Sequence, residues 1–359
     1  MPPLGHPRVK FDFFIMRARL KDVAAKAGVA PNTASTILNR RPNSWASKAT
    51  EERVFKAAEE LGYRPSRAAM GLRLGRYKSI GLVVPDLHNP FYIAFADLLE
   101  RRIRQDGYDL ILEHSRSDME YQRHCLSAIL DRQIDAVTYF VGDLKSHLDF
   151  LQEAAKTSTP VVAHIGPTAE PIGFDAIMMD FSKGIRGAVK HLLKLGHKRF
   201  AFLCALVKGQ HPGDRPSLVN QLLREHGIPD EDNHVISCAH DLESVRESFA
   251  KFLRKAKKRR PTALIAMNDL SAIAAIRAAK DYGLEVPEDL SVIGVDNIPM
   301  GEYLHRRLTT IAQPLEKLAD TTADMLFHRL SESGKNGKPM KERFATELLL
   351  KETTAKPSS

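Results

Sequence analysis

Residues 20 to 39 carry apolar positions at helical spacing and predict two short helices. The apolar side chains of the first helix recur at i, i+3, i+4 and i+7, which places them in one stripe; they are Leu20, Val23, Ala24 and Ala27. Gly28 can adopt the left-handed conformation that ends many helices, so the first helix is expected to stop there. Pro31 is expected to begin the second helix, where its missing N–H leaves no hydrogen bond unmade.

The second of these helices combines a small apolar stripe with a row of short polar side chains. Ala34, Ile37 and Leu38 are expected to be buried. The polar residues are then expected to face outward; they are Asn32, Thr33, Ser35, Thr36 and Asn39. A short helix that presents only small polar groups suits insertion into the major groove of DNA. From this segment alone, an ordinary helical hairpin with no DNA partner is the alternative.

Two further segments follow before the chain changes character. Residues 47–61 have the pattern of a third helix. After Pro65 breaks the chain, Ser66 can cap a short segment, residues 66–74, that contains two arginines and no acid. Gly71 costs this segment roughly 1 kcal/mol of helix stability relative to alanine, and so short a helix is marginal alone. We therefore expect a hinge that is helical only when DNA or a second subunit orders it.

From about residue 78 onward, runs that are apolar throughout alternate with amphipathic segments of helix length. The runs include SIGLVVPDL, DAVTYFV, PVVAHIG, RFAFLCA, TALIAM and LSVIGVD. Such runs, separated by helices, indicate parallel sheets that are buried on both faces. About 280 residues of this pattern are too many for one compact sheet and predict two α/β lobes. Ligands of open α/β sheets bind outside the carboxyl ends of the strands, where polar residues follow several of these runs.

The positive charge of the protein is concentrated at its amino-terminal end. Residues 1–78 contain 16 Lys and Arg against 6 Asp and Glu, a net charge of +10, whereas the remainder has a net charge of −1. Neutralisation of DNA phosphates requires such a local excess, while a charge that serves only solubility would be spread over the chain. The charge therefore favours the DNA-binding interpretation of residues 20–39.

Motifs along nearly the whole chain resemble those of the lactose and galactose repressor family. They are RLKDVAAKAGV, TEERVFKAAEELGYRPSRAAMGLRLGRYKSIGLVVPDLHNPFY, HLLKLGHKRFAFL, AMNDLSAIAAIRA, VPEDLSVIGVDNIP and LTTIAQPLEKLA, in the family's order from about residue 17 to 352. The resemblance implies an all-α helix-turn-helix headpiece, a hinge helix, and an α/β two-lobe core with parallel sheets like that of the periplasmic sugar-binding proteins. It also implies a homodimer on a near-palindromic operator.

The same resemblance supplies the expected domain boundaries. The helix-turn-helix domain would span residues 17–64, the hinge helix and linker residues 65–77, and the effector-binding and dimerisation core residues 78–352. Because the chain of the family crosses between the lobes three times, we expect two pieces in each lobe. The N-lobe would contain residues 78–176 and 308–333, and the C-lobe residues 177–307 and 340–352.

The residues expected to bind a small-molecule effector lie at or near strand ends. By resemblance, Phe91 would line the pocket, and Arg215, Asn268 and Asp296 would hydrogen-bond the effector. Two further candidates are Asp118, which follows the apolar run YDLILEHS, and Lys183, where some sugar-binding members carry an acid. Carboxylate and amide groups can bind the hydroxyls of a sugar or a nucleoside. The resemblance to sugar-binding proteins implies that the effector is a sugar or sugar derivative. For Asn268 a helix N-cap is an equal alternative, and for Lys183 a solvated surface position is the alternative.

The residues expected to contact DNA come from the two short helices and the hinge. They are Leu20, Pro31, Asn32, Thr33, Ser35, Thr36, Asn39, Ser66, Arg67 and Leu72. In the family, the hinge leucine at the position of Leu72 inserts between base pairs from the minor groove and kinks the DNA. The chain departs from the family at Ala30, where the helix cap is usually serine, and at Thr36, where many members have arginine; the operator is therefore expected to differ at that base step.

Other function classes find little support in the sequence. Cys125, Cys204 and Cys238 have no metal-binding spacing, and neither a catalytic motif nor a cofactor-binding motif occurs. We therefore expect no enzyme, no metal and no cofactor. No apolar run approaches a membrane span and no signal peptide is evident, so the expected location is the cytoplasm, in association with the nucleoid. Residues 1–15 match nothing in the family, and Met16 is an alternative start.

The sequence as a whole thus predicts a DNA-binding transcription regulator, a repressor whose operator affinity is set allosterically by an effector bound between two lobes. Such coupling is reciprocal, since the effector and the operator change each other's affinity by the same factor. A small-molecule binding protein of the periplasmic type, with no role on DNA, is the alternative. The charge of residues 1–78 and the lack of an export signal argue against it.

Overall fold

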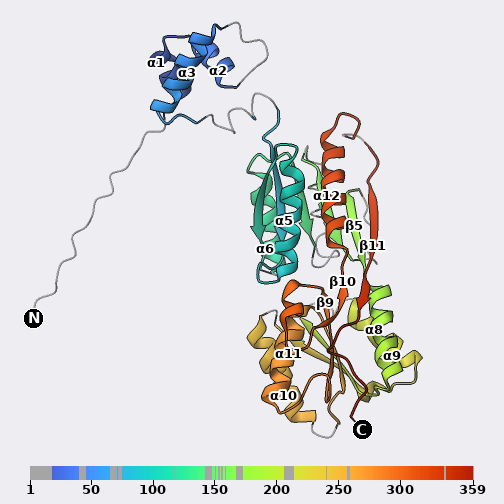
Figure 1. Cartoon of the computed structure of the whole chain (residues 1–359). Helices are drawn as coiled ribbons and strands as arrows, with labels where there is room; N and C mark the ends of the chain where they lie inside the picture. Colours follow the sequence, from blue (N-terminus) through green and yellow to red (C-terminus); the bar gives the residue numbers. More distant parts are fainter. Residues whose placement is uncertain are drawn as a thin grey trace, which may run out of the picture. The chain divides into compact units, whose positions relative to one another are not determined.

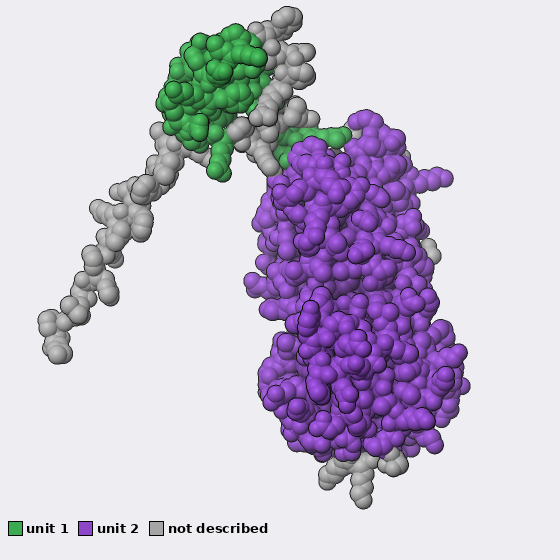
Figure 2. Space-filling view, viewed as in Figure 1, with its two compact units in different colours: residues 1–77 green, residues 78–359 purple. Residues whose placement is uncertain are grey.

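The computed structural model divides the chain into two compact units, residues 1–77 and residues 78–359, which Figure 2 colours separately. The described residues are 18–39, 46–64, 71, 75–116, 118–141, 148–149, 151–152, 154, 157, 159–166, 173–205, 214–239, 241–256, 259–334 and 337–358. Each unit has a hydrophobic core of its own, so each is considered by itself.

In the first unit, residues 18–39 and 46–64 form three helices packed on one small core. They are α1 (Leu20–Ala27), α2 (Pro31–Leu38) and α3 (Lys48–Glu60). The helix stop predicted at Gly28 is confirmed, because Gly28 caps α1 with a φ of 64°. Ser47 caps α3 by accepting a hydrogen bond from the Thr50 N–H, whereas Ala30 leaves the N-terminus of α2 without a side-chain cap. The predicted helix-turn-helix is therefore present, and its second helix has no side-chain cap of the kind that α3 has.

The described residues of the second unit form two six-stranded sheets. The first sheet is entirely parallel in the order β11-β5-β4-β3-β1-β2. Its strands are β1 (Ser79–Val84), β2 (Asp109–His114), β3 (Ala136–Phe140), β4 (Val161–Ile165), β5 (Asp175–Asp180) and β11 (Lys341–Ala345). Three of its helices are α5 (Pro90–Arg104), α6 (Met119–Leu130) and α12 (Leu315–Leu330).

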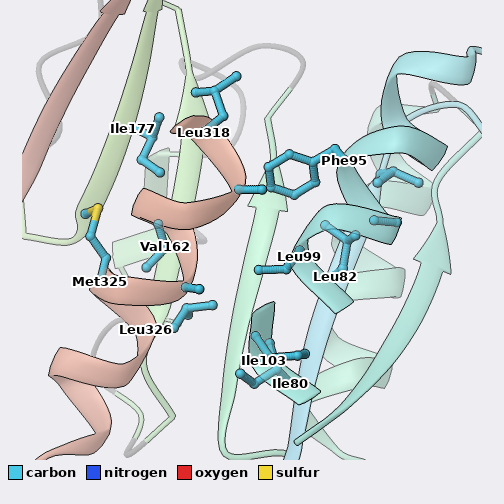
Figure 3. Close-up of a cluster of buried hydrophobic side chains, with 14 of the residues drawn as sticks. Ile80, Leu82, Phe95, Leu99, Ile103, Val162, Ile177, Leu318, Met325 and Leu326 are labelled. Carbon is cyan, nitrogen blue, oxygen red and sulfur yellow. The ribbon is translucent and has the colours of Figure 1, made fainter. Parts of the chain in front are cut away.

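Helices α5 and α12 cover the same face of the first sheet and pack against each other (Figure 3). Ile80 and Leu82 on β1 meet Phe95 and Leu99 on α5, while Leu326 on α12 completes the layer. All five side chains are fully buried. The alternation of apolar runs with amphipathic segments predicted this arrangement, since both faces of a parallel sheet need a cover.

The second sheet has the order β12-β10-β9-β8-β6-β7, and its edge strand β12 is the antiparallel member. Its strands are β6 (Phe200–Ala205), β7 (Asn233–Cys238), β8 (Ala263–Ala266), β9 (Ser291–Asp296), β10 (Thr309–Ala312) and β12 (Glu347–Leu349). Four helices labelled in Figure 1 surround it: α8 (Ser182–Leu195), α9 (Asp214–Glu225), α10 (Leu242–Ala256) and α11 (Asp269–Asp281). Two short 3-10 turns are η1 (Asp230–Asp232) and η3 (Pro299–Tyr303). We call the two sheets with their helices the first and second lobes.

The three crossings between the lobes occur, but the predicted boundaries of the lobes were wrong in three places. Strand β5 extends the first lobe to residue 180, beyond the predicted limit of 176. Strand β10 belongs to the second lobe, although residues 308–333 were assigned to the first. Residues 340–352 are shared, because β11 joins the first sheet and β12 the second. The buried Thr346 alone separates these two strands, so the pattern there resembled a single strand.

Candidate effector site and DNA-binding surface

Asp296 stands at the carboxyl end of β9 and receives hydrogen bonds from two amides. Asn89 Nδ2 donates to Asp296 Oδ2 over 2.9 Å, and Gln313 Nε2 donates to Asp296 Oδ1 over 2.7 Å. Asp296 is only 9% exposed, and its φ of 108° is unusual for a residue other than glycine. Burial raises the pKa of this carboxyl to about 6, although Asn89, Arg215 and Gln313 oppose the shift. The surrounding structure therefore holds a strained residue in one orientation.

A second carboxylate, that of Asp269, is buried at the start of α11. Its Oδ1 accepts a hydrogen bond from Thr310 Oγ1 over 2.6 Å, and its Oδ2 accepts one from the Ile298 N–H over 2.8 Å. Burial and the charge of Asp296 raise the pKa of Asp269 to about 7. A Cβ at Gly294 would overlap this carboxylate, so β9 can carry only glycine at that point without a local shift.

Arg215 brings a positive charge from α9 toward Asp296. Its Nη1 donates a hydrogen bond to the Met267 carbonyl over 2.8 Å. Its guanidinium lies over the Phe181 ring, 4.8 Å from the ring centroid, as in a cation–π contact. The charge of Arg215 favours the ionised form of Asp296. The guanidinium is thus fixed on one side by a carbonyl and on its face by an aromatic ring.

The first lobe contributes aromatic rings to the same region. Phe91 is buried and makes edge contacts with Tyr92, 5.3 Å between ring centroids, and with Phe140, 6.3 Å away. Tyr92 also meets Phe140 edge-on at 5.2 Å. Burial and the nearby charge of Asp296 raise the pKa of the Tyr92 phenol, while Arg215 lowers it. Tyr92 therefore lies close to the carboxylate of Asp296 and the guanidinium of Arg215, both in the second lobe.

The remaining predicted effector residues are placed less favourably. Asn268 caps α11, since its Oδ1 accepts a hydrogen bond from the Ser271 N–H over 2.8 Å, but its half-buried side chain directly precedes Asp269. Asp118 is exposed and caps α6 through the Tyr121 N–H. Lys183 is exposed in the first turn of α8. These placements agree with the alternatives stated for the two residues: Asn268 is a helix cap, and Lys183 lies at the surface.

Four residues of this region were not singled out by the sequence prediction. Asn89 and Tyr92 lie in the segment 86–92 that follows the first strand, and the letters NPFY that end the second family motif were a signal for them. Gln313 and Phe181 lie where the chain crosses between the lobes. No local pattern marks such crossings, so only the three-dimensional structure brings these two side chains to the site.

The recognition surface of α2 differs from its prediction at one position. Pro31 and Asn32 are exposed, and Thr33 and Thr36 are partly exposed. The prediction that Ser35 faces outward was wrong, because its side chain is 8% exposed. Helix α2 is contacted by both α1 and α3, so its buried sector is wider than a stripe of three residues. Asn39 covers Ser35 from the end of the helix, with Nδ2 donating to the Ser35 carbonyl over 2.6 Å.

The other predicted DNA contacts divide into two groups. Leu20 is half-buried and packs against the core of the headpiece, so its side chain already helps to hold α1 in place. Ser66, Arg67 and Leu72 lie outside the described residues.

The described residues contain no helix that is both long and apolar enough to cross a membrane. Among them, no three His, Cys or acidic side chains gather as the ligands of a metal ion would.

The comparison with known proteins decides the family. Residues 19–66 match the bacterial regulatory proteins of the lacI family, and residues 189–354 match a periplasmic binding protein-like domain. The HTH-type transcriptional regulator DegA of Bacillus subtilis (strain 168) is 32% identical over 307 residues, which cover 84% of this chain and 88% of DegA. The chain belongs to the LacI family. It is therefore a DNA-binding transcription regulator and not an enzyme.

Solved structures of the LacI family agree with this fold. The lac repressor dimer bound to operator and the anti-inducer ONPF has a TM-score of 0.77 at 25% identity, covering 94% of this chain and 99% of that one. A LacI family transcriptional regulator from Enterococcus faecium with bound ribose has a TM-score of 0.65 at 26% identity, covering 77% and 99%. The headpiece and the two-lobe core of this chain are thus those of a LacI-family regulator.

Proposed function

We propose that this regulator is a repressor whose effector, a sugar or sugar derivative, binds between the two lobes. The observation that carries the proposal is that groups from both lobes meet around Asp296. Its carboxylate accepts a hydrogen bond from Asn89 of the first lobe and lies near Arg215 of the second. Carboxylate, amide and guanidinium groups suit the hydroxyls of a sugar, and the rings of Phe91 and Tyr92 suit its apolar C–H face. The Enterococcus relative that binds ribose supports the same class of ligand.

Within this site we assign the main contacts to Phe91, Arg215, Asn268 and Asp296. Asn268 has its Oδ1 engaged as a helix cap, so its amide nitrogen is the group that would face the effector. Asp118 and Lys183, both exposed, would make only peripheral contacts. This ranking predicts that substitutions of the first four residues weaken effector binding far more than substitutions of the last two.

A thermal-shift screen of the purified full-length protein tests the effector class. Pentoses, hexoses, disaccharides, sugar acids and nucleosides would be compared at millimolar concentration, because a ligand at 100 times its Kd stabilises by about 2.7 kcal/mol. We expect a sugar or sugar derivative to raise the melting temperature. That shift should disappear in Arg215→Met and persist in the matched control Lys183→Met. A response to nucleosides alone, or an equal response in Arg215→Met, would contradict the proposal.

We further propose that α2 reads the major groove of a near-palindromic operator through Asn32, Thr33 and Thr36, with Pro31, Leu20 and Asn39 holding the helix at the DNA. In the hinge, Ser66 and Arg67 would contact the DNA backbone and Leu72 would insert into the minor groove. The excess of basic residues in the first 78 supports this surface. In a gel shift with operator selected from random DNA, Leu72→Ala should abolish tight binding. Its effector-dependent thermal shift should remain that of the parent.

A palindromic operator calls for a homodimer, which we also propose. The lac repressor of the comparison is a dimer, and the core of this chain exposes large apolar side chains such as Ile93, Met300 and Tyr303. Light scattering coupled to size exclusion should give a mass of twice the 40.1 kDa chain. A monomer at micromolar concentration would contradict the dimer.

Since the operator lies on the chromosome, the regulator would work in the cytoplasm in association with the nucleoid.

A further inference from the structure

The side chain of Asn89 makes two hydrogen bonds, one within the first lobe and one to the second. Its Oδ1 accepts from the Phe91 N–H over 3.0 Å and so caps α5 of the first lobe. Its Nδ2 donates over 2.9 Å to Asp296 at the end of β9, which is the second lobe. The side chain is 5% exposed and 207 positions away from Asp296 in the chain. One planar amide is thus held by its own helix and reaches into the opposite lobe.

We propose that the hydrogen bond between Asn89 and Asp296 is a latch that holds the two lobes of the core closed. The bond joins the elements that carry the effector site, so its formation fixes the distance between them. Asn89 acts in this closure as a positioning residue. Its contribution to effector binding rests on the proposed function, whereas closure of the lobes needs no effector and does not rest on it.

The geometry around Asp296 explains why Asn89 can decide closure. Gln313 holds the other oxygen of Asp296 but lies on the crossing between β10 and α12, which is covalently continuous with both lobes. The apolar side chains of Leu270 and Ile298 join the core cluster of the first lobe. Apolar contacts of this kind are not directional and tolerate small shifts, whereas a hydrogen bond weakens steeply with distance and angle. Among these contacts, the hydrogen bond of the Asn89 amide fixes the position of one lobe relative to the other.

Charge and burial strengthen this one bond. Its acceptor is a carboxylate that Arg215 helps to keep ionised, and hydrogen bonds to ionised acceptors are about twice as strong as neutral ones. The low exposure of Asn89 and Asp296 keeps water from replacing the partner. Each oxygen of Asp296 has a second lone pair, so an effector hydroxyl can share the carboxylate with Asn89 rather than compete with it. Closure and effector binding should therefore reinforce each other.

The experiment measures lobe closure in the full-length protein without any sugar. Spin labels on Asp97→Cys in α5 and Lys280→Cys in α11 report the distance between the lobes by pulsed electron resonance, and both positions are exposed. The natural cysteines Cys125, Cys204 and Cys238 are buried and should not react.

Two variants remove the latch and keep the helix cap. Asn89→Ser retains an oxygen for the Phe91 N–H and loses the amide, and Asn89→Asp retains the cap oxygen and places a carboxylate against Asp296. We expect Asn89→Ser to raise the ratio of open to closed molecules about tenfold or more, and Asn89→Asp to raise it further. The matched control is Asn220→Ser, which removes a 2.7 Å hydrogen bond from Asn233 within the second lobe. It should leave the distance distribution unchanged.

The outcome that overturns the latch is a distance distribution in both Asn89 variants that superimposes on that of the parent. Should either variant fold poorly, Asp296→Asn weakens the same bond from the other lobe and must shift the distribution in the same direction. Because no effector is present, a negative sugar screen would leave this result intact. Conversely, a latch that fails here would leave the sugar proposal standing.

Discussion

Asp269 and Asp296 are two buried carboxyls near the carboxyl end of β9, and the charge of Asp296 affects the ionisation of Asp269. Asp269 is 1% exposed, and burial together with the charge of Asp296 raises its pKa to about 7. Burial raises the pKa of Asp296 to about 6. The hydrogen-bond partners explain which of the two holds a proton more easily. Both donors to Asp296 are amide NH2 groups, which cannot accept a hydrogen bond from a protonated carboxyl, whereas the Thr310 hydroxyl beside Asp269 can turn and accept one.

The first prediction is that Asp269→Asn removes a pH dependence of folding stability. The folded-state pKa of Asp269, about 7, lies above its ordinary value of 3.8, so the folded state binds a proton between these values that the unfolded state has lost. Its contribution to stability is thus present below about pH 4 and is lost as the pH rises to 7. The slope reaches about 1.4 kcal/mol per pH unit. Urea unfolding from pH 4.5 to 7.5 measures it.

The comparison between variant and parent is essential in this experiment, because other groups titrate in the same range. Burial lowers the pKa of His164 to about 3, which makes stability fall as the pH drops below its ordinary 6.5, the opposite sign. Subtracting the parent profile from the variant profile cancels His164. The difference should rise with pH, since the amide introduced by Asp269→Asn does not titrate. An exposed control, Asp97→Asn, should track the parent; a flat difference for Asp269→Asn would contradict the prediction.

The second prediction concerns Arg329, which ties α12 to β5 through a buried ion pair. Its Nε and Nη2 donate to the two oxygens of Asp175, each over 2.6 Å, and Met340 N–H donates to the same carboxylate over 2.7 Å. Replacing one partner of a buried pair leaves the other charge without compensation. We expect Arg329→Met to lower the free energy of unfolding by about 3–5 kcal/mol, measured by urea titration.

A matched surface variant shows whether burial is the cause of that loss. Arg101 forms an ion pair with Asp97 on α5, but both side chains are more than half exposed. Such pairs contribute about 0–1 kcal/mol, so Arg101→Met should lower stability by no more than that. Equal losses of unfolding free energy in Arg329→Met and Arg101→Met would show that the buried ion pair with Asp175 contributes no more to stability than the exposed one.

The third prediction is that Ala30→Ser stabilises the headpiece. Ala30 stands at the N-cap of α2 with φ −66° and ψ 148°, the extended conformation in which a serine hydroxyl accepts a backbone hydrogen bond. The gain should be about 1 kcal/mol, read as slower hydrogen exchange of the α2 amides in the full-length protein. Ser47→Ala is the reciprocal variant, since Ser47 already caps α3, and should speed exchange in α3. Unchanged protection of α2 in Ala30→Ser would refute the prediction.

Much of the fold followed from local patterns, because local chemistry decides where helices and strands begin and end. The helical spacing around Val23, the left-handed Gly28 and the proline at the start of α2 all correspond to the observed elements. The apolar runs became strands for the same reason. Which sheet a strand joins is a different matter, since β11 and β12 are separated by a single residue and pair with strands of different lobes. Pairing over such distances leaves no mark in a short window of sequence.

The candidate site shows the same division. Asp296 and Asn268 could be named because they directly follow apolar runs at strand ends. Gln313 could not, because its amide reaches Asp296 only after the chain has turned from β10 toward α12. Ser35 was misplaced for a related reason. An eight-residue helix that packs against two neighbours buries more than one narrow stripe, and apolar spacing alone records only part of that contact.

The last prediction separates two nearby positions of α2, Thr33 and Ser35. Thr33 is partly exposed, whereas Ser35 is buried and its carbonyl is bonded by the Asn39 amide. If α2 reads bases with its exposed side, Thr33→Ala removes a direct contact and should weaken operator binding by about 1–3 kcal/mol, or roughly fivefold to 150-fold. Ser35→Ala should change the affinity little. Fluorescence anisotropy with selected operator at fixed salt provides both values, and a larger loss in Ser35→Ala than in Thr33→Ala would mean that the headpiece turns Ser35 toward the DNA on binding.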